Sequence, residues 1–387
     1  MDNYLLNQIN ETFIENWNNH FSTHIKTKAE MIEQLRRQPP TRKIDRELKL
    51  SSKGNLCFFT SGTSGQETFF QMNPETLFGK FAVGLGQMYE ELFNVSNHNI
   101  ASAILAFPMD GSPLGLKHLF ALLELGVDVY PGGNRNLDFT PQQVVNLVHK
   151  KEIEMLVSRP LEVGVYGRLA KKWNLDTSSV MAILMTGEVI GKRRLKMLGE
   201  YFPNAEIKSV YGLTEINAGL FACECGNYHF RTNGQTVVDL EQRDNSIYSS
   251  IYFTIIRPEL SVIRYNTRDV GHIVENCPCS QGGHALCVKG RDSDEIARDF
   301  FILDFSERLY EYGYEHNVFG DITQDGKYHL IVKSMELIEE KVLDQLKAEL
   351  PNVVISNYLF GNEDNYIPKT KSCTLHRGVE KYEVPNY

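Results

Sequence analysis

The feature that most constrains the fold of this chain is a regular alternation of short apolar runs with segments of helical periodicity between residues 58 and 210. The apolar runs expected to form strands lie at 101–107, 127–130, 154–158, 180–185 and 205–210. The segments expected to form helices lie at 115–125, 144–149, 161–172 and 192–201. Strands that alternate with helices predict right-handed crossovers and a mainly parallel sheet covered by helices. Ligands of such sheets bind beyond the carboxyl ends of the strands, so we expect the functional site there.

The N-terminal segment and the portion after the parallel strands differ from this pattern. Leu5, Ile9, Phe13 and Trp17 recur at helical spacing within residues 1–50. They predict an amphipathic cap packed on the core or a lid over a ligand pocket. Residues 216–290 are expected to be β-rich, because they contain long β-branched runs at 246–256 and 260–265.

The pattern of apolar and helical segments changes again after residue 291. Strand-like runs at 300–305, 328–332 and 353–358 alternate with helical segments at 307–312 and 336–350. We therefore predict an α/β protein with a large N-terminal domain, residues 1–290, in which mainly parallel sheets flanked by helices are joined by the β-rich portion. A small, mobile α+β domain is expected at residues 291–387.

Composition narrows the classes of function. A length of 387 residues favours two domains. The net charge of −9 argues against a nucleic-acid partner. No apolar run is long enough to span a membrane, and the first residues do not have the pattern of a signal peptide. We expect a cytoplasmic protein whose seven cysteines are thiols or metal ligands.

A loop of hydroxyl residues and glycines is the first candidate binding element. It comprises Ser61, Gly62, Thr63, Ser64 and Gly65, between the aromatic pairs Phe58-Phe59 and Phe69-Phe70 that are typical of strand ends. The glycines permit positive φ angles, and such a loop can direct its N–H groups at a polyphosphate. The alternative is an ordinary hairpin turn, because serine, threonine and glycine are common turn residues. The loop lacks the Gly-Lys-Ser/Thr step of a Walker A motif.

Downstream motifs place this loop in a wider pattern. Tyr211-Gly212-Leu213-Thr214-Glu215, Tyr265-Asn266-Thr267-Arg268-Asp269 and Gly290-Arg291-Asp292 follow it in order. With this set the chain resembles the adenylate-forming superfamily of acyl-CoA synthetases, peptide-synthetase adenylation domains and luciferases. Glu224-Cys225 with His229, and Cys277-Pro278-Cys279, resemble the phenylacetate–coenzyme A ligase branch.

The resemblance implies roles for individual residues in the use of ATP. Ser61, Gly62, Thr63, Ser64 and Gly65 would grip the phosphates, Thr214 would contact the α-phosphate, and Glu215 would bind Mg²⁺. Gly187 and Glu188 match the adenine-side loop, and Tyr211 with Gly212 would lie beside adenine or the acyl pocket. Asp269 would accept hydrogen bonds from the ribose hydroxyls, and Arg291 would contact the ribose or a phosphate. Lys371 or Lys369 would supply the C-terminal lysine that touches the carboxylate and the α-phosphate.

Three positions depart from the superfamily pattern. Gln66-Glu67 stands where a Lys-Pro step is usual, which removes a cation from the phosphate loop. Arg268 replaces a glycine before Asp269, and the expected hinge residue, Asp294, lies one residue further from Arg291 than usual. The first departure raises the question of whether pyrophosphate is handled efficiently.

The cysteines form a second constellation. Cys223-x-Cys225 and Cys277-x-Cys279 are close pairs, with His229, His284 and Cys287 nearby. Two pairs of soft ligands on separate turns can build a closed, structural zinc site. The resemblance favours Cys225, His229, Cys277 and Cys279 as ligands and leaves Cys223 as a competitor. The alternative is a group of buried free thiols.

The resemblance implies an AMP-forming acid–thiol ligase that uses ATP and Mg²⁺. It would activate a carboxylic acid, of aryl or arylacetic type, as an acyl-adenylate and pass the acyl group to coenzyme A. A second hypothesis keeps the adenylation but passes the acyl group to a carrier protein or an amine. A third is a degenerate relative that binds nucleotide without turnover. A homodimer is the default assembly.

Overall fold

The computed structural model describes residues 3–41, 54–60, 68–109, 112–133, 139–213, 218–230, 234–257, 260–322, 327–350, 352–359 and 373–375. The chain forms two compact units. The first contains Met1–Glu47 and Lys208–Asp299, and the second contains Leu48–Ile207 and Phe300–Tyr387. The bounds of these two compact units differ from those of the two domains expected at 1–290 and 291–387. That domain division stays a prediction.

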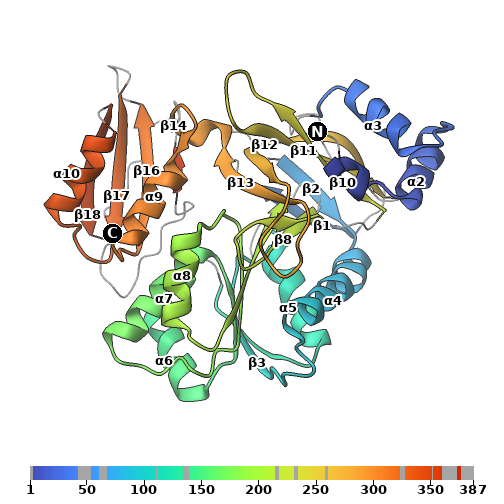
Figure 1. Cartoon of the computed structure of the whole chain (residues 1–387). Coiled ribbons are helices and arrows are strands. Elements are labelled where there is room, and N and C mark those ends of the chain that lie inside the picture. The colour runs from blue at the N-terminus through green and yellow to red at the C-terminus, as the bar shows by residue number, and fades with distance from the viewer. Residues whose placement is uncertain are drawn as a thin grey trace. The chain divides into compact units, whose positions relative to one another are not determined.

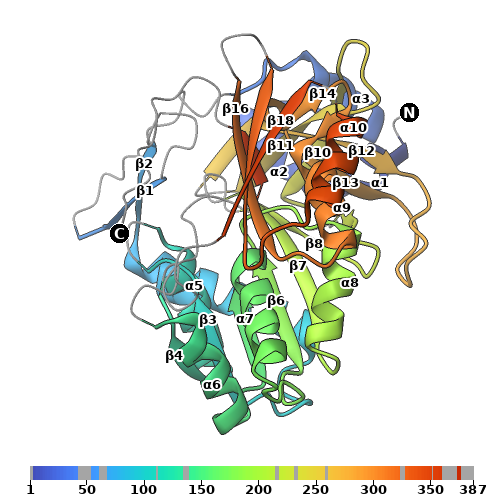
Figure 2. The ribbon, with the colours of Figure 1, turned by 90° about the vertical axis from the view of Figure 1, so that its left-hand side faces the viewer.

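The second unit is built around the predicted parallel sheet. Its strands are β3 (Ser102–Ala106), β4 (Asp128–Pro131), β5 (Met155–Ser158) and β6 (Ala182–Thr186), in the order β6-β5-β3-β4. Each neighbouring pair is parallel. The crossover helices are α5 (Leu114–Glu124), α6 (Pro141–Lys151), α7 (Pro160–Lys172) and α8 (Lys192–Tyr201), as Figure 2 shows. Every residue of β5 and β6 is buried, as expected for strands covered on both faces.

The α/β class predicted from the sequence is therefore confirmed, and the expected strands and helices lie within a few residues of the observed ones. The main core of this unit joins the inner faces of α6, α7 and α8 to the sheet. Before the parallel strands come an antiparallel hairpin of β1 (Leu56–Thr60) and β2 (Thr68–Met72), a π-helical turn (Thr76–Phe81) and α4 (Ala82–Phe93).

The C-terminal segment of the second unit carries its own sheet. The strands of this sheet are β16 (His316–Ile322), β17 (Tyr328–Ser334), β18 (Val353–Leu359) and β19 (Cys373–Leu375), and the helices are α9 (Ile302–Glu311) and α10 (Glu340–Glu349). The short strand β15 (Phe300–Phe301) precedes α9 and lies outside this sheet. The sheet order is β18-β17-β16-β19, with α9 and α10 beside it (Figure 1). The strand expected at 300–305 is wrong beyond Phe301. Ile302, Phe305 and Leu309 are buried at helical spacing, so they form the inner face of α9.

The first unit is the β-rich portion with its N-terminal cap. Its strands are β7 (Glu206–Leu213), β8 (Ala218–Ala222), β9 (Tyr228–His229), β10 (Thr236–Gln242), β11 (Ser249–Arg257), β12 (Leu260–Val274), β13 (Ala285–Arg291) and β14 (Glu295–Ala297). The ladders β10-β11-β12-β13-β9-β8-β7 are antiparallel. A 3₁₀ turn at Asp292–Asp294 follows β13.

Three helices form the cap: α1 (Asn3–Gln8), α2 (Glu11–Phe21) and α3 (Lys28–Arg37). Phe13 and Trp17 are almost fully buried and share a core with Val237 of β10 and Ile256 of β11. The N-terminal helices are thus a packed cap, one of the two roles expected from their sequence. None of the helices in the described part of the chain combines the length and the apolar character needed to cross a membrane.

Candidate functional site

A buried carboxylate with two partners forms the centre of the candidate site in the first unit. Asp269 on β12 lies opposite Arg291 on β13, and the Arg291 Nε lies 3.1 Å from the Asp269 Oδ1. The Tyr211 hydroxyl at the end of β7 donates a 2.6 Å hydrogen bond to the Asp269 Oδ2. The Asp269 N–H also donates to the Thr267 hydroxyl, at 3.0 Å. The structure therefore gathers three residues that the sequence analysis assigned to the nucleotide.

Tyr211 takes part in this cluster through its hydroxyl. Its ring packs against Tyr228 and Phe253, with centroids 5.6 and 6.0 Å away, and the side chain is buried. Burial and the neighbouring Asp269 charge raise the pKa of Tyr211 well above its usual value, so the phenol stays a hydrogen-bond donor. The packing is that of a core aromatic whose polar end holds the carboxylate.

The backbone beside Asp269 explains one departure from the superfamily pattern. Arg268 has φ +60°, in the left-handed region that favours glycine. Its side chain is exposed and pairs with Asp292 at 3.6 Å. Arg268 thus adopts a backbone conformation that glycine favours.

The second unit carries Gly187 and Glu188, which the resemblance assigns to the adenine side, at the carboxyl end of β6. Gly187 has φ +99°, which permits the tight turn that follows the strand. The Glu188 carboxylate lies 3.4 Å from the Arg194 Nη1 on α8, and both side chains are buried. Glu188 is therefore held by an internal ion pair rather than left open to solvent.

Further buried charges surround this turn. Arg159 forms a bidentate pair with Glu162, whose pKa is raised by burial. Arg194 also reaches Glu315, 2.9 Å away in the C-terminal segment. Burial, opposed by the Arg194 charge, raises the pKa of Glu315 to about 7. The sequence analysis missed both ion pairs. The spacing of Arg194 with Met197, Leu198 and Tyr201 on the buried face of α8 could have indicated that Arg194 is buried, but not which residue it meets.

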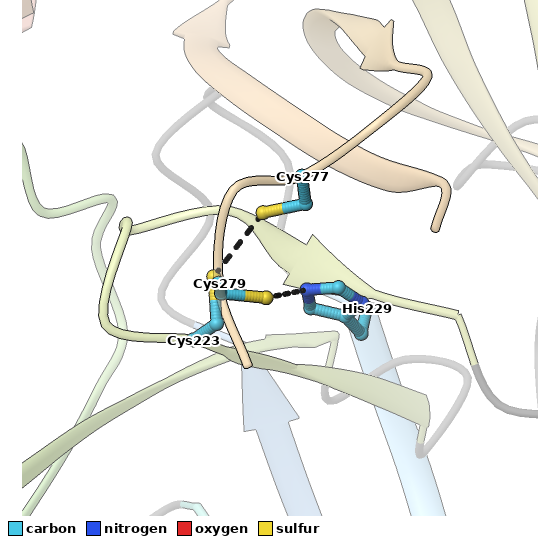
Figure 3. Close-up of side chains that lie close together, drawn as sticks. All are labelled: Cys223, His229, Cys277 and Cys279. Atoms are coloured by element: carbon cyan, nitrogen blue, oxygen red, sulfur yellow. Dashed lines mark hydrogen bonds between the residues drawn. The ribbon is translucent and has the colours of Figure 1, made fainter. Parts of the chain in front are cut away.

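A cluster of sulfur and nitrogen ligands forms the second candidate site, in the first unit. Cys223 follows β8, His229 lies on β9, and Cys277 and Cys279 lie in the connection from β12 to β13. Figure 3 shows these four side chains pointing toward one another. The Sγ atoms of Cys223 and Cys277 are 3.6 Å apart, and the Cys279 Sγ lies 3.1 Å from the His229 Nε2. All four ligand atoms lie within 4.8 Å of one another.

Two tight turns present the cysteines. The Gly226 N–H donates to the Cys223 carbonyl at 2.9 Å, and the Gly282 N–H donates to the Cys279 carbonyl at 3.1 Å. The Asn227 amide lies 3.4 Å from the Cys277 Sγ. Burial raises the pKa of the Cys277 thiol. Hydrogen bonds from Asn227, Cys279 and His229 outweigh burial, so the pKa of Cys277 is lowered overall, which favours a thiolate.

The donor set fits a tetrahedral zinc ion. Zinc–sulfur bonds of about 2.3 Å place tetrahedral ligands about 3.8 Å apart, close to the observed separations. The cysteines of this cluster are free thiols in the structure, not disulfides. The structure brings together Cys223, His229, Cys277 and Cys279, whereas the resemblance favoured Cys225 over Cys223. Cys225 packs against the cluster but does not belong to the converging set.

Several predicted site residues lie outside the described part of the chain. They are Ser61, Gly62, Thr63, Ser64, Gly65, Gln66, Glu67, Thr214, Glu215, Lys369 and Lys371. The described strands agree with the expected flanks of the phosphate loop, because Thr60 and Thr68 pair across the β1–β2 hairpin. Gly212 lies within β7, opposite Gly219 of β8.

Comparison with solved structures defines the class of fold. Neither a protein-family model nor a curated protein matches the sequence. The structure nevertheless has the fold of the adenylate-forming ligases, a class to which all the solved structures named below belong.

The individual matches span most of the chain. A 2-hydroxyisobutyryl-CoA ligase in its postadenylation state, with its acyl-adenylate, aligns over 95% of this chain and 85% of its own, with a TM-score of 0.67 and 12% identity. A second match is a structure from a study of the fatty acyl-adenylate ligases of E. coli and L. pneumophila. It aligns over 82% of this chain and 67% of its own, with a TM-score of 0.56 and 16% identity. An anthranilate CoA ligase with anthranoyl-AMP aligns over 82% of this chain and 64% of its own, with a TM-score of 0.54 and 12% identity.

Proposed function

We propose that this chain is an AMP-forming ligase that activates a carboxylic acid with ATP and passes the acyl group to coenzyme A. The observation that carries the proposal is the near full-length structural match to a ligase that holds an acyl-adenylate. In the first step, a carboxylate oxygen attacks the α-phosphate and pyrophosphate leaves. In the second, the thiol displaces AMP from the acyl carbon and loses its proton.

In this proposal Asp269 binds the ribose. A carboxylate has about four acceptor positions on its two oxygens, and Tyr211 and Arg291 each use one. The remaining positions can accept hydrogen bonds from a pair of vicinal hydroxyls. Because Tyr211 and Arg291 already fix the carboxylate, little ordering is needed when the nucleotide binds.

The roles of the other predicted residues remain part of the proposal. Ser61–Gly65 grip the phosphates, Thr214 contacts the α-phosphate, Glu215 holds a Mg²⁺ ion, and Lys371 or Lys369 meets the reacting carboxylate. A bound Mg²⁺ supplies positive charge to the leaving pyrophosphate. The Gly187–Glu188 turn lies on the adenine side.

Product analysis separates the possible acceptors. Purified protein is incubated with ATP, Mg²⁺ and a panel of aryl, arylacetic, fatty and amino acids, with and without coenzyme A, and products are identified by mass spectrometry. The proposal predicts AMP and an acyl-CoA that form only when both acid and coenzyme A are present. Acyl-adenylate that accumulates but is never transferred to coenzyme A would favour a carrier-protein or amine acceptor instead. The absence of AMP with every acid would contradict the proposal.

The Tyr211 hydroxyl gives a prediction about the nucleotide. Replacement by phenylalanine removes a hydrogen bond to a charged group, which is worth about 1.5–3 kcal/mol, so we expect the KM for ATP to rise about tenfold. The KM for the acid should change little, because the bond is made to Asp269. Steady-state kinetics with each substrate varied in turn measures the two constants. An unchanged KM for ATP would exclude this role for Tyr211.

We also propose that Cys223, His229, Cys277 and Cys279 hold a structural zinc ion. Elemental analysis of the purified protein should find about one zinc per chain, as a closed four-ligand site requires. Cys223→Ser and Cys277→Ser should each lower the zinc content well below one, because serine is a poor zinc ligand.

Two matched variants sharpen this test. Cys57→Ser changes an exposed cysteine on β1 and should keep the zinc. Cys225→Ser should also keep it if the ligand set is the one that the structure brings together. Zinc lost from Cys225→Ser and kept in Cys223→Ser would assign the set favoured by the resemblance. A zinc-free wild-type protein, purified without chelator, would overturn the proposal.

A further inference from the structure

Two glutamates of the C-terminal segment enter gaps that glycines leave on α7 and α8. A Cβ added at Gly164, inside α7, would lie 2.3 Å from the Glu315 carboxylate. A Cβ added at Gly191, before α8, would lie 2.0 Å from the Glu307 Cδ. Side chains at either position would displace these carboxylates, so both glycines serve the docking of the segment.

The two glutamates hold α8 in different ways. Glu307 of α9 accepts hydrogen bonds from the Arg193 and Arg194 backbone N–H groups, at 2.8 and 3.4 Å. It thereby caps the start of α8, whose own N-cap residue, Gly191, has no side chain to do so. Glu315 pairs with the Arg194 side chain, which also lies over the Tyr310 ring at 4.8 Å.

Arg194 continues this connection to the turn after β6. One end of its guanidinium lies 2.9 Å from Glu315, and the other lies 3.4 Å from Glu188. Arg194 and Glu315 are almost completely buried, at 2% and 0% side-chain exposure. A single arginine therefore joins the C-terminal segment to the turn that contains Gly187.

We infer that Arg194, held in place by Glu315, is a positioning residue for the Thr186–Glu188 turn and couples the docking of the C-terminal segment to nucleotide binding. The inference rests on the proposed function, because that function places this turn on the adenine side. It adds two residues that the sequence analysis did not assign to the site.

The buried pair is better suited to positioning than to stability. Removing two charges from water costs more than an isolated pair usually returns, and apolar replacements of such pairs are often neutral. The Glu315 Oε2 has no hydrogen-bond partner among the described residues, which adds to the cost. A contact that costs stability and yet joins two segments far apart in the chain is consistent with a functional connection.

The test compares two ion pairs that join the same two parts of the fold. The double variant Arg194→Met with Glu315→Gln removes the two charges of that pair together. It also takes the Arg194 partner from Glu188, which is the contact that the inference assigns to the turn. The control, Arg193→Met with Glu311→Gln, removes an exposed pair between α8 and α9 with a separation of 3.2 Å. Hydrogen–deuterium exchange of the peptide covering residues 186–190 and the kinetics of ATP and acid are measured for both.

We expect exchange in this peptide and the KM for ATP each to rise about tenfold in the buried-pair variant, the scale of one lost charged hydrogen bond. The kcat should change less than about threefold. The exposed-pair control should match the wild type, because exposed pairs contribute little.

Several results decide against the inference. Unchanged exchange in a folded buried-pair variant would overturn it, as would kcat and KM changes that merely follow the melting temperature in both variants. If the wild type showed no activity with any acid, the proposed function would fail. The exchange measurement would then still decide whether Arg194 holds the turn.

Discussion

We expect Asp269→Asn to lower kcat/KM for ATP by about a hundredfold or more. The substitution keeps the size of the side chain but removes the charge that accepts the ribose hydroxyls, and hydrogen bonds to a charged group are worth about 1.5–3 kcal/mol each. The asparagine amide also presents donors to Arg291, so the fixed geometry of the cluster is lost. The measurement is the initial rate of AMP formation as a function of ATP, with melting temperature as the check on folding.

Asp292→Asn is the matched control for this variant. It removes a carboxylate of the same charge directly after Arg291, where the side chain is part-exposed and pairs with Arg268 at 3.6 Å. An exposed pair contributes little, so we expect kcat/KM to stay within about twofold of the wild type. Wild-type kinetics in a folded Asp269→Asn variant would show that Asp269 does not contact the nucleotide.

The largest effect on stability is expected from Gly164→Ala. An alanine in a helix interior ordinarily stabilises a protein by about 1 kcal/mol relative to glycine. At residue 164 the new Cβ would meet the Glu315 carboxylate at 2.3 Å, and that carboxylate cannot move without leaving Arg194. Overpacking of this kind costs about 1–3 kcal/mol, which outweighs the gain from alanine, so the free energy of unfolding should fall by about 1 kcal/mol.

Gly199→Ala provides the comparison. Gly199 lies inside α8, and a Cβ added there has no neighbour within 4 Å. This variant should raise the free energy of unfolding by about 0.5–1 kcal/mol. Urea unfolding of both variants measures the difference. Equal stabilisation by the two alanines would mean that Glu315 does not occupy the gap at Gly164.

Local sequence patterns predicted the central strands of the parallel sheet well, because β5 and β6 are buried on both faces and therefore form uninterrupted apolar runs. Residues 180–185, for example, lie close to the observed β6 at Ala182–Thr186. The same logic failed at residues 300–305, where aromatic residues suggested a strand. Only the spacing of Ile302, Phe305 and Leu309 reveals the buried face of α9.

Contacts between residues far apart in the chain could not be predicted from local sequence patterns. Arg194 and Glu315 are separated by 121 positions, and no local pattern indicates that they meet. The Cys/His cluster was expected from the spacing of its cysteines. The choice between Cys223 and Cys225 depends on how the turn closed by Gly226 directs each side chain, which is a property of the folded backbone.

Acid-dependent exchange of labelled pyrophosphate into ATP is the decisive measurement of acyl-adenylate formation by this chain. The reaction reports reversible formation of the acyl-adenylate and needs no acceptor, so it is independent of coenzyme A. We predict exchange that depends on Mg²⁺ and on one class of acid in the panel, and that is lost in Asp269→Asn. Absence of exchange with every acid, in a protein that still binds ATP, would contradict adenylate formation.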